Sequence, residues 1–438
     1  MVLTYKNIGI TVSAAFRISV LLFLAFVTTA ECCGEILTDA HGRKIRFAGK
    51  YDPRPVFLTN APAPRREFRG IWISTVKNLD IPPYRSAAAF RSGIRSMLDK
   101  IAAAKFNAVI FQVRPHSDAY YHSALSPVSR CYSGYEGKTP DLNFDPLPFI
   151  ISEAHKRGLE FHAWLNPYRV TGDTTLSKNA YLQTLYRSNF ARLNPDKVLA
   201  FRQGKTTSLF LDPGNPAVVN HLGEVVRELV VKYNIDAIHI DDYFYPYENI
   251  GTLDAATFRR FNPSRLQLGD WRRQNTENLI IRIRQVIDRE NRRLNKKVRF
   301  GVSPFGIWAN GSKIRGGSPT GGKQTYSDLY ADTRKWVKKR YIDYIAPQLY
   351  WQFSHEKAAY AGLAQWWCDT TRNSGVKLYT GLAPYRLGSP GWSENELVNQ
   401  LRFNRARPEI SGAIFFSYRH VFGARPHRGV RKMLNHIR

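Results

Sequence analysis

The sequence predicts an α/β protein, a (β/α)8 barrel of the TIM type preceded by a short N-terminal signal and a lead-in segment. From residue 65 onward, apolar β-rich runs alternate with amphipathic helical stretches, which is typical of βαβ units and a parallel sheet. Eight such units occur in order, as a barrel of this type requires. The alternative is a doubly wound open sheet, but no glycine-rich phosphate-binding loop follows the first predicted strand.

The predicted strands and helices follow one another in a regular order, with longer loops after the third and fourth strands. The strands are predicted at Phe68–Thr75, Ala108–Val113, Glu160–Leu165, Ala237–Asp241, Val298–Ser303, Tyr344–Leu349, Lys377–Leu382 and Gly412–Ser417. The helices that follow them are predicted at Ala87–Ala104, Pro146–Arg157, Ala217–Tyr233, Trp271–Leu294, Tyr326–Lys339, Ala358–Asn373, Glu394–Arg405 and Val430–Ile437. Each unit would give one strand to the barrel wall and one helix to its outer layer.

Residues 1–30 have the pattern of a secretory signal peptide. Lys6 and Arg17 are basic, the run Ile18–Val27 is apolar, and small residues at 28–30 precede Glu31. This pattern predicts export to the periplasm or the cell envelope. The alternative is an uncleaved membrane anchor, for which the apolar run is short.

Residues 31–64 are predicted to form the lead-in segment, and residues 65–438 the barrel. The lead-in ends in Ala-Pro-Ala-Pro, which is typical of a linker. Lipidation of Cys32 or Cys33, near its start, would attach the mature protein to a membrane. The other cysteines are Cys131 and Cys368, and the four show neither metal-ligand spacing nor a dense disulfide framework.

The chain is strongly basic. It has 64 Lys and Arg against 35 Asp and Glu, a net charge of +29, and about +27 remains without residues 1–30. Such a charge favours polyanionic partners, and for an exported protein anionic glycans, cell-wall peptides or lipid head groups fit better than nucleic acid. The alternative is that the basic residues only coat the surface, since many lie on predicted helices, such as Arg282–Arg293. No cofactor is expected.

The fourth predicted strand ends in two carboxylates, Asp241 and Asp242, and an aromatic loop follows. An ionised group is costly to bury without a partner, so acids at a strand end indicate the functional face of a barrel. Because side chains alternate along a strand, His239 and Asp241 share one face. Asp241 is therefore predicted to be the nucleophile or base of a glycoside cleavage, which needs two carboxylates. Asp242 would serve as proton donor if the chain bends there.

Polar and aromatic residues also follow the other predicted strands, where they would form a sugar-binding rim. The residues predicted to bind substrate are Trp72, Asn78, Gln112, Arg114, His116, Asp118, His162, Trp164, Asn166, Tyr168, Arg169, His239, Tyr243, Tyr245, Ser303, Trp308, Gln348, Tyr350 and Trp351. The second acid stays open between Asp242, Asp118 and the loop residues Glu248 and Glu356.

Two other functions fit the same residues. A glycan-binding barrel without a second catalytic carboxylate would also account for the aromatic rim and the positive charge. A metal-dependent hydrolase would use His162, His239 and Asp241 as a set of two histidines and one carboxylate. No His-x-His sequence follows the first predicted strand, however, and the sequence predicts no metal site.

The chain resembles the glycosyl hydrolase-like family 10 group of bacterial cell-envelope proteins. The resemblance spans roughly residues 67–417 and rests on ordered matches at residues 69–76, 107–115, 161–169, 211–214, 239–246, 268–273, 303–308, 330–336 and 345–351. It implies a TIM-type barrel that hydrolyses glycan bonds, in some relatives those of peptidoglycan strands, preferably after the stem peptides have been removed.

The resemblance also implies which residues form the site. It makes Asp241 and Asp242 the catalytic centre, lined by Gln112, Arg114, Asn166, Tyr243, Gln348 and Tyr350. Two departures stand out. Ile81 lies where relatives often carry Trp, which would weaken one sugar platform, and His116 lies at a position that varies and is acidic in some members.

Overall fold

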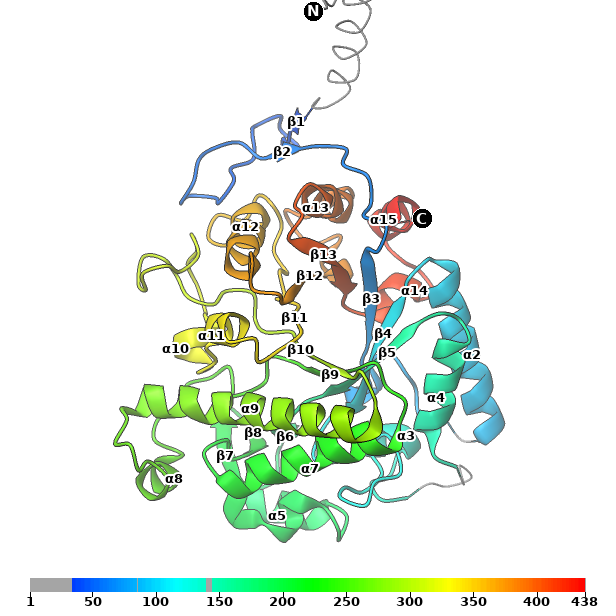
Figure 1. The fold of residues 1–438 in the computed structure, drawn as a ribbon, viewed down its shortest axis with the longest axis vertical. Helices are drawn as coiled ribbons and strands as arrows, with labels where there is room; N and C mark the ends of the chain where they lie inside the picture. Colours follow the sequence, from blue (N-terminus) through cyan, green and yellow to red (C-terminus); the bar gives the residue numbers. More distant parts are fainter. Residues whose placement is uncertain (1–33, 85, 139–143, 438) are drawn as a thin grey trace, which may run out of the picture.

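The computed structural model describes residues 34–84, 86–138 and 144–437 (Figure 1). The predicted signal at residues 1–30 and the candidate lipidation sites Cys32 and Cys33 lie outside the described residues. The described chain contains a closed barrel of parallel strands, helices around it, a small antiparallel sheet and an N-terminal pair of short strands. Cys131 and Cys368 are both buried and free, so they do not form a disulfide.

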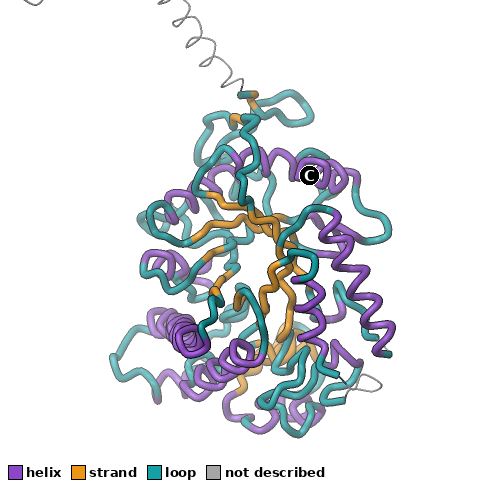
Figure 2. Tube along the Cα trace, turned by 45° about the vertical axis from the view of Figure 1, so that its right-hand side comes forward, coloured by secondary structure: helices purple, strands orange, loops and turns teal. Residues whose placement is uncertain are grey.

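The barrel confirms the predicted (β/α)8 fold class. Its strands pair in parallel in the order of the chain, and β13 closes the barrel against β3. They are β3 (Phe68–Ile73), β4 (Ala108–Arg114), β5 (Glu160–Leu165), β9 (Ala237–Ile240), β10 (Arg299–Val302), β11 (Tyr344–Ile345), β12 (Lys377–Leu382) and β13 (Ile410–Phe415). Figure 2 shows these strands in the centre of the molecule with helices on the outside.

One longer helix or helix pair follows each strand. They are α2 (Ala87–Ala103), α4 (Pro146–His155), α7 (Pro216–Lys232), α9 (Leu268–Leu294), α10 (Thr325–Asp328) with α11 (Thr333–Lys338), α12 (Tyr360–Thr371), α13 (Glu396–Arg405) and α15 (Arg428–Ile437). Short helices in the connections are α3 (Arg130–Ser133), α5 (Lys178–Thr184), α6 (Phe190–Leu193), α8 (Ala255–Arg260) and α14 (Tyr418–Phe422). In the part of the chain that the structure describes, every helix is too short or too polar to cross a membrane.

The connection from β5 to α7 holds a second sheet that the sequence analysis treated as loop. Its strands are β6 (Arg169–Thr174), β7 (Val198–Gln203) and β8 (Thr206–Leu211), paired antiparallel with β8 in the middle. Figure 1 shows this sheet near the lower end of the molecule, at the level of α7 and α9, with α5 below α7. It gives the barrel an extended wall beside the carboxyl end of β5.

The interior of the barrel is tightly filled by alternating large and small residues. At β10, a Cβ added to Gly301 would lie 1.9 Å from Cζ of the Tyr344 ring, which occupies that space. The Tyr344 side chain is 1% exposed. Gly301 is therefore required by the close approach of an aromatic ring from the neighbouring strand.

We expect Gly301→Ala to lower the free energy of unfolding by about 2 kcal/mol or more, because the added methyl group forces the ring or the strand to move. Thermal denaturation measures the change. Gly172→Ala is the matched control, since its Cβ would have no neighbour within 4 Å in β6. Equal stability of the two variants would show that the Tyr344 ring can move aside without cost.

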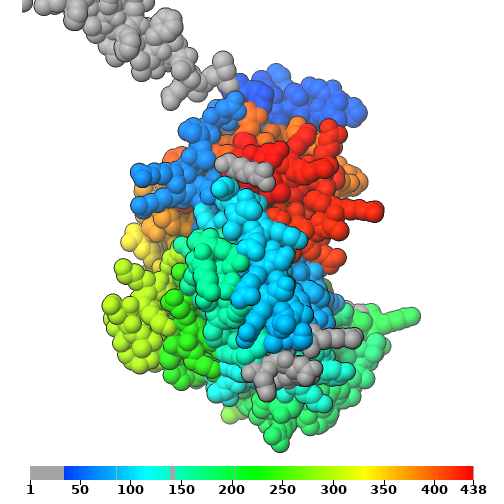
Figure 3. All heavy atoms as spheres, turned by 90° about the vertical axis from the view of Figure 1, so that its right-hand side faces the viewer, coloured from blue at the N-terminus to red at the C-terminus, as the bar shows by residue number. Residues whose placement is uncertain are grey.

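The lead-in segment packs on the barrel rather than hanging free. β1 (Glu35–Ile36) pairs with β2 (Phe57–Leu58), and Glu35 forms an ion pair with Arg402 on α13. The backbone N of Lys50 donates to the carbonyl oxygen of Glu356 at 3.1 Å. Figure 3 shows this segment, in blue, against the C-terminal part of the chain, in orange and red.

Candidate active site

Asp241 follows β9 directly and is 6% exposed. Trp164 Nε1 donates to its Oδ2 at 3.1 Å, and the backbone N of Tyr243 donates to its Oδ1 at 3.3 Å. Asn166 Nδ2 lies 3.2 Å from Oδ1 and 3.0 Å from Oδ2. Burial raises the pKa of Asp241, and the charge of Arg169 together with these donors opposes the rise. Such donors favour the ionised form that a nucleophile or base requires.

Asn166 and Arg169 fix the orientation of this group of donors. Asn166 is fully buried, and its Oδ1 accepts from the backbone N of Arg169 at 2.9 Å, so its Nδ2 faces Asp241. The Arg169 guanidinium lies 4.5 Å from the centre of the Tyr243 ring. Its positive charge opposes the rise that burial causes in the pKa of both Asp241 and Asp242.

Asp242 lies in a different environment from its neighbour. It is 8% exposed, and its Oδ2 is buried without a hydrogen-bond partner among the described residues. Burial, and next the negative charge of Asp241, raise its pKa to about 7, against the opposing influence of Gln348 and Arg169. Asp242 therefore keeps its proton to a higher pH than an ordinary aspartate does, which suits a general acid.

Gln112 on β4 presents a donor to the same space. Its Oε1 accepts from Ser74 Oγ at 3.1 Å and from the backbone N atoms of Thr75 and Val76 at 3.0 and 2.9 Å. Because these donors fix the amide, its Nε2 must point away from them, and this buried atom has no partner in the described chain. Gln112 Nε2 is thus available to a ligand oxygen.

His239 lies directly below Asp241 on β9 and is fully buried. Trp72 Nε1 donates to its Nε2 at 3.3 Å, Ser303 Oγ lies 2.8 Å from the same atom, and Nδ1 lies 2.9 Å from the Tyr344 hydroxyl. Burial holds the pKa of His239 well below 6.5, so the ring is neutral. An indole N–H can only donate, so Nε2 is the acceptor and Nδ1 carries the proton.

The same line of hydrogen bonds continues to the opposite end of the barrel. The Tyr344 hydroxyl lies 2.8 Å from His162 Nδ1, and His162 Nε2 lies 3.1 Å from Glu160 Oε2. Burial lowers the pKa of His162 as well. Glu160 forms an ion pair with Arg299 at 2.5 Å. In this series of hydrogen bonds each group therefore donates to the next, from Trp72 through His239, Tyr344 and His162 to the Glu160 carboxylate.

The two aspartates open onto one cavity of about 210 Å³ at the carboxyl ends of the barrel strands. Its lining combines carboxylates, amides, a guanidinium and aromatic rings, as carbohydrate sites often do. The lining residues are Trp72, Ser74, Val76, Leu79, Gln112, Trp164, Arg169, Asp241, Asp242, Ser303, Gln348, Tyr350 and Phe416. Of the residues predicted to bind substrate, Asn166, His239 and Tyr243 lie behind this lining as hydrogen-bond or ring partners of its residues. His162 lies deeper in the barrel, where its partners Tyr344 and Glu160 are outside the lining.

Ser74, Val76, Leu79 and Phe416 were absent from the predicted site. Ser74 directly follows β3 and shares a face with Trp72, two residues before it, so the pattern of the strand contained the signal for it. Its position is held by Asp80, whose Oδ2 accepts from the backbone N of Ser74 at 2.7 Å and whose Oδ1 accepts from Ser417 Oγ at 2.8 Å. Asp80 thus joins the ends of β3 and β13.

Arg114 and Asp118 are turned away from the cavity and hold the loop after β4. Pairing between β4 and β5 shifts between Gln112 and Arg114, which places Arg114 beside the loop, where Nη1 donates to Ser126 Oγ at 3.1 Å. Asp118 accepts from Ser129 Oγ at 2.7 Å and from the backbone N of His116 at 3.2 Å. Neither side chain belongs to the cavity lining.

Other residues of the predicted rim also pack elsewhere. Tyr168 and Tyr245 lie in the apolar core between strands and helices, Trp308 donates to Asp332 at 2.9 Å, and Trp351 packs edge-on against Phe305. Asn78 donates to the carbonyl oxygens of Ile81 and Cys131. The loop acids Glu248 and Glu356 lie outside the cavity lining.

The donor set proposed for a metal does not converge. His162 and His239 engage both ring nitrogens with Tyr344, Ser303, Trp72 and Glu160. Within residues 34–84, 86–138 and 144–437, no three His, Cys, Asp or Glu side chains are grouped as metal ligands. These residues do not fit a metal-dependent hydrolase.

Comparison with known proteins assigns the chain to a family. It is 40% identical to glycosyl hydrolase YngK of Bacillus subtilis (strain 168) over 82% of this chain and 70% of that protein. It is 37% identical to glycosyl hydrolase DigH of Escherichia coli (strain K12) over 80% of this chain and 82% of that protein. Among solved structures, α-L-fucosidase isoenzyme 2 of Paenibacillus thiaminolyticus aligns with 15% identity and a TM-score of 0.43, over 85% of this chain and 48% of that one. The glycosyl hydrolase-like 10 family matches residues 67–399, and the chain belongs to this family.

Proposed function

We propose that this protein is an exported glycoside hydrolase that cleaves glycosidic bonds in the glycan strands of peptidoglycan. The observation that carries the proposal is the pair Asp241 and Asp242, which line one cavity in unlike environments. One carboxylate is surrounded by donors, and the other has a free oxygen and a pKa raised to about 7. Carboxyl groups with separate acid and base roles are what glycosidic cleavage needs.

In this proposal Asp242 gives its proton to the glycosidic oxygen as the bond from that oxygen to the anomeric carbon breaks. Asp241 either attacks the anomeric carbon or takes a proton from a water that attacks it. Trp164 and Asn166 hold Asp241 in place during either route. Gln112 Nε2 and Gln348 lie where they can bind sugar hydroxyl groups.

The substrate class has separate support. The rings of Trp72, Trp164, Tyr350 and Phe416 line the cavity, and those of Tyr350 and Phe416, which are only partly buried, offer faces on which sugars stack. The charge of +29 suits an anionic wall polymer. The relatives YngK and DigH are named glycosyl hydrolases, and the family resemblance implies peptidoglycan strands as substrate.

The proposal is tested by incubating the purified protein with peptidoglycan glycan strands, with and without stem peptides, and measuring new reducing ends. We expect soluble fragments, and more of them from strands without peptides. Chitin oligosaccharides serve as a neutral comparison. Binding without new reducing ends on any of these substrates would contradict hydrolysis and favour a glycan-binding barrel.

Export and attachment are part of the proposal and need their own readout. Residues 1–30 would direct the protein to the periplasm or the cell envelope, with or without a lipid on Cys32 or Cys33. The N-terminal residue and mass of protein recovered from the envelope measure this. A start near Glu31 supports cleavage of the signal, an acylated Cys32 or Cys33 supports lipid attachment, and an intact Met1 in the cytoplasm contradicts export.

A further inference from the structure

A second and larger cavity, of about 520 Å³, lies outside the site described above. It is formed by the segment after α3 and by the end of α5 with the loop that follows. The residues that carry the argument are Arg130, Tyr135, Lys138, Tyr186, Arg187 and Arg192. No role in the proposed cleavage has been given to it.

The lining of this second cavity is strongly basic. Glu136 is the only acid among the described residues of this lining, and it accepts from Arg130 Nη2 at 2.9 Å and from Asn189 Nδ2 at 2.6 Å. Lys138, Arg187 and Arg192 form no ion pair with a carboxylate among the described residues. Three positive charges are therefore left without an acidic partner in one hollow of the described surface.

Aromatic rings lie beside these charges. Tyr135 is 65% exposed, and Lys138 Nζ lies 5.8 Å from the centre of its ring. Tyr186 lies against the backbone of Gly137, where an added Cβ would meet its ring at 2.3 Å, and Arg187 Cζ lies 6.0 Å from its centre. An exposed ring beside a cation provides both a stacking face and a charge partner for an acidic sugar.

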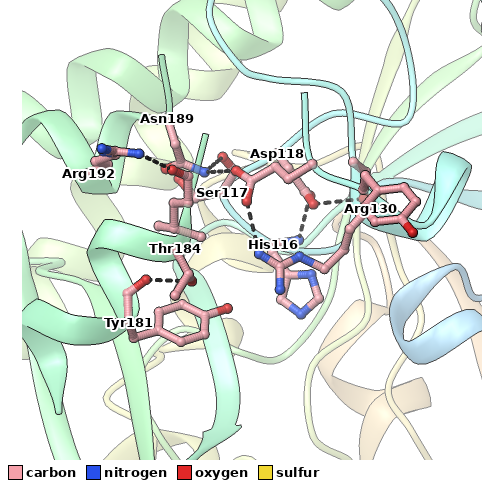
Figure 4. Close-up of polar contacts among 12 residues, drawn as sticks. His116, Ser117, Asp118, Arg130, Tyr181, Thr184, Asn189 and Arg192 are labelled. Carbon is pink, nitrogen blue, oxygen red and sulfur yellow. Dashed lines mark hydrogen bonds and ion pairs between the residues drawn. The ribbon is translucent and has the colours of Figure 1, made fainter. Parts of the chain in front are cut away.

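The walls of the second cavity are held in place by buried polar contacts. Arg192 Nη1 donates to the carbonyl oxygen of Leu185 at 2.5 Å, and the nearly buried Asn189 donates from Nδ2 to the carbonyl oxygen of Ser117 at 3.0 Å. Figure 4 shows Arg192 and Asn189 on one side of Ser117 and Asp118, and Arg130 on the other. Arg192 is thus fixed in the wall of the cavity, and Asn189 is fixed behind it.

The loop after β4 connects the two cavities. Arg169, which lines the active-site cavity, donates from Nη1 to the carbonyl oxygen of Pro115 at 3.4 Å. Two residues further on, the carbonyl oxygen of Ser117 accepts from Asn189, which also donates to Glu136 in the lining of the second cavity. His116 lies in the same loop. Burial, followed by the charges of Arg169 and Arg130, lowers its pKa to about 3. Of these two arginines, Arg169 lines the first cavity and Arg130 the second. Residues beside both cavities therefore contact the same short stretch of this loop, Pro115 to Ser117.

We propose that the second cavity is a distal subsite that binds a carboxylate-bearing sugar of the same glycan strand whose bond is cleaved in the first cavity. Lys138 and Arg187 contact the carboxylate, and Tyr135 provides the stacking face. This inference rests on the proposed function, because it takes the strand as substrate. It also predicts that the protein binds a strand with free carboxylates more tightly than a neutral strand.

The test compares two double variants with equal loss of charge. Lys138→Gln with Arg187→Gln removes the free cations of the second cavity. Lys297→Gln with Arg431→Gln is the control, because these exposed cations lie before β10 and on α15, away from both cavities. The probes are stem-peptide-free peptidoglycan strands and the same strands with their carboxyl groups converted to amides.

We expect the first double variant to raise KM about tenfold on the carboxylate strands with kcat unchanged, and to have no effect on the amidated strands. The control should match the wild-type protein on both probes. Equal KM for the wild-type protein and the first double variant on carboxylate strands would overturn the inference. An equal loss on both probes would also overturn it, since the side chains would then act without regard to charge.

Direct binding separates this inference from the proposed function. Calorimetric titration of the same strands into the uncleaving Asp241→Asn protein, with and without the two substitutions, does not depend on turnover. Tighter binding of carboxylate than of amidated strands, lost in the double variant, supports the subsite even if the wild-type protein fails to cleave. If the wild-type protein cleaves the strands but carboxylate and amidated strands bind equally tightly, the subsite is refuted and the proposed function is not.

Discussion

Asp241→Asn is expected to reduce kcat by roughly 10³-fold or more while leaving the fold intact. The amide keeps the shape of the carboxylate, and its oxygen can still accept from Trp164 Nε1 or the backbone N of Tyr243. It cannot attack an anomeric carbon or remove a proton from water. The loss therefore falls on the chemical step rather than on stability.

The rate is measured as reducing ends released from peptidoglycan strands, and the fold by thermal denaturation. Asp369→Asn is the control. Asp369 lies on α12, its side chain is 55% exposed, and it pairs with Arg372, which directly follows the helix. The control should match the wild-type rate. Turnover by a folded Asp241→Asn protein within tenfold of wild type would remove Asp241 from the mechanism.

Asp242→Asn is expected to lower kcat about 10²- to 10⁴-fold on natural strands, the range that general acids contribute. The wild-type rate should fall as the pH rises through about 7, because Asp242 must be protonated to donate. The variant should lose this dependence. A synthetic glycoside with a nitrophenol leaving group needs no protonation, so the variant should keep much more of its rate there.

Comparing the pH profiles of the two proteins on both substrates tests this role. An equal loss on the natural strand and the nitrophenyl glycoside would contradict a proton donor and point to a role in binding. An unchanged decline in rate above pH 7 in the variant would assign that titration to another group.

The raised pKa of Asp242 also affects stability, with a defined sign. Its pKa in the folded protein, about 7, lies above the ordinary value of 3.8. The unfolded chain therefore loses this proton at lower pH than the folded one, and stability declines as the pH rises between these values. Asp242→Asn removes this decline, so the melting temperature of the variant relative to wild type should be higher at pH 8 than at pH 5.

Much of the fold follows from patterns within short segments. The limits of β5 and β12 agree with the prediction because each is an apolar run between clear breaks. β11 ends at Ile345, four residues early, and Pro347, which has no N–H for a strand ladder, lies just beyond it. The helix predicted at 326–339 is interrupted, because Tyr330 has a φ of 52° and Asp332 caps a new helix.

The candidate site was predictable where alternation along a strand decides which way a side chain points. Alternation places Trp72, Gln112, Trp164 and Asp241 toward the cavity. It fails at Arg114, because the irregular pairing after Gln112 depends on the register of two strands and cannot be seen in one. The second cavity joins segments from two loops, and no local pattern indicates their meeting.

The hydrogen-bonded histidines beneath Asp241 affect how the charge of the site depends on pH. Burial lowers the pKa of His239 and of His162, which favours their neutral forms, and raises the pKa of Tyr344 well above its ordinary value. Burial thus opposes a change of charge at all three of these side chains. The two aspartates above them differ, because burial raises the pKa of both and brings that of Asp242 to about 7. A change of acidity near neutral pH therefore alters the charge of the site at Asp242.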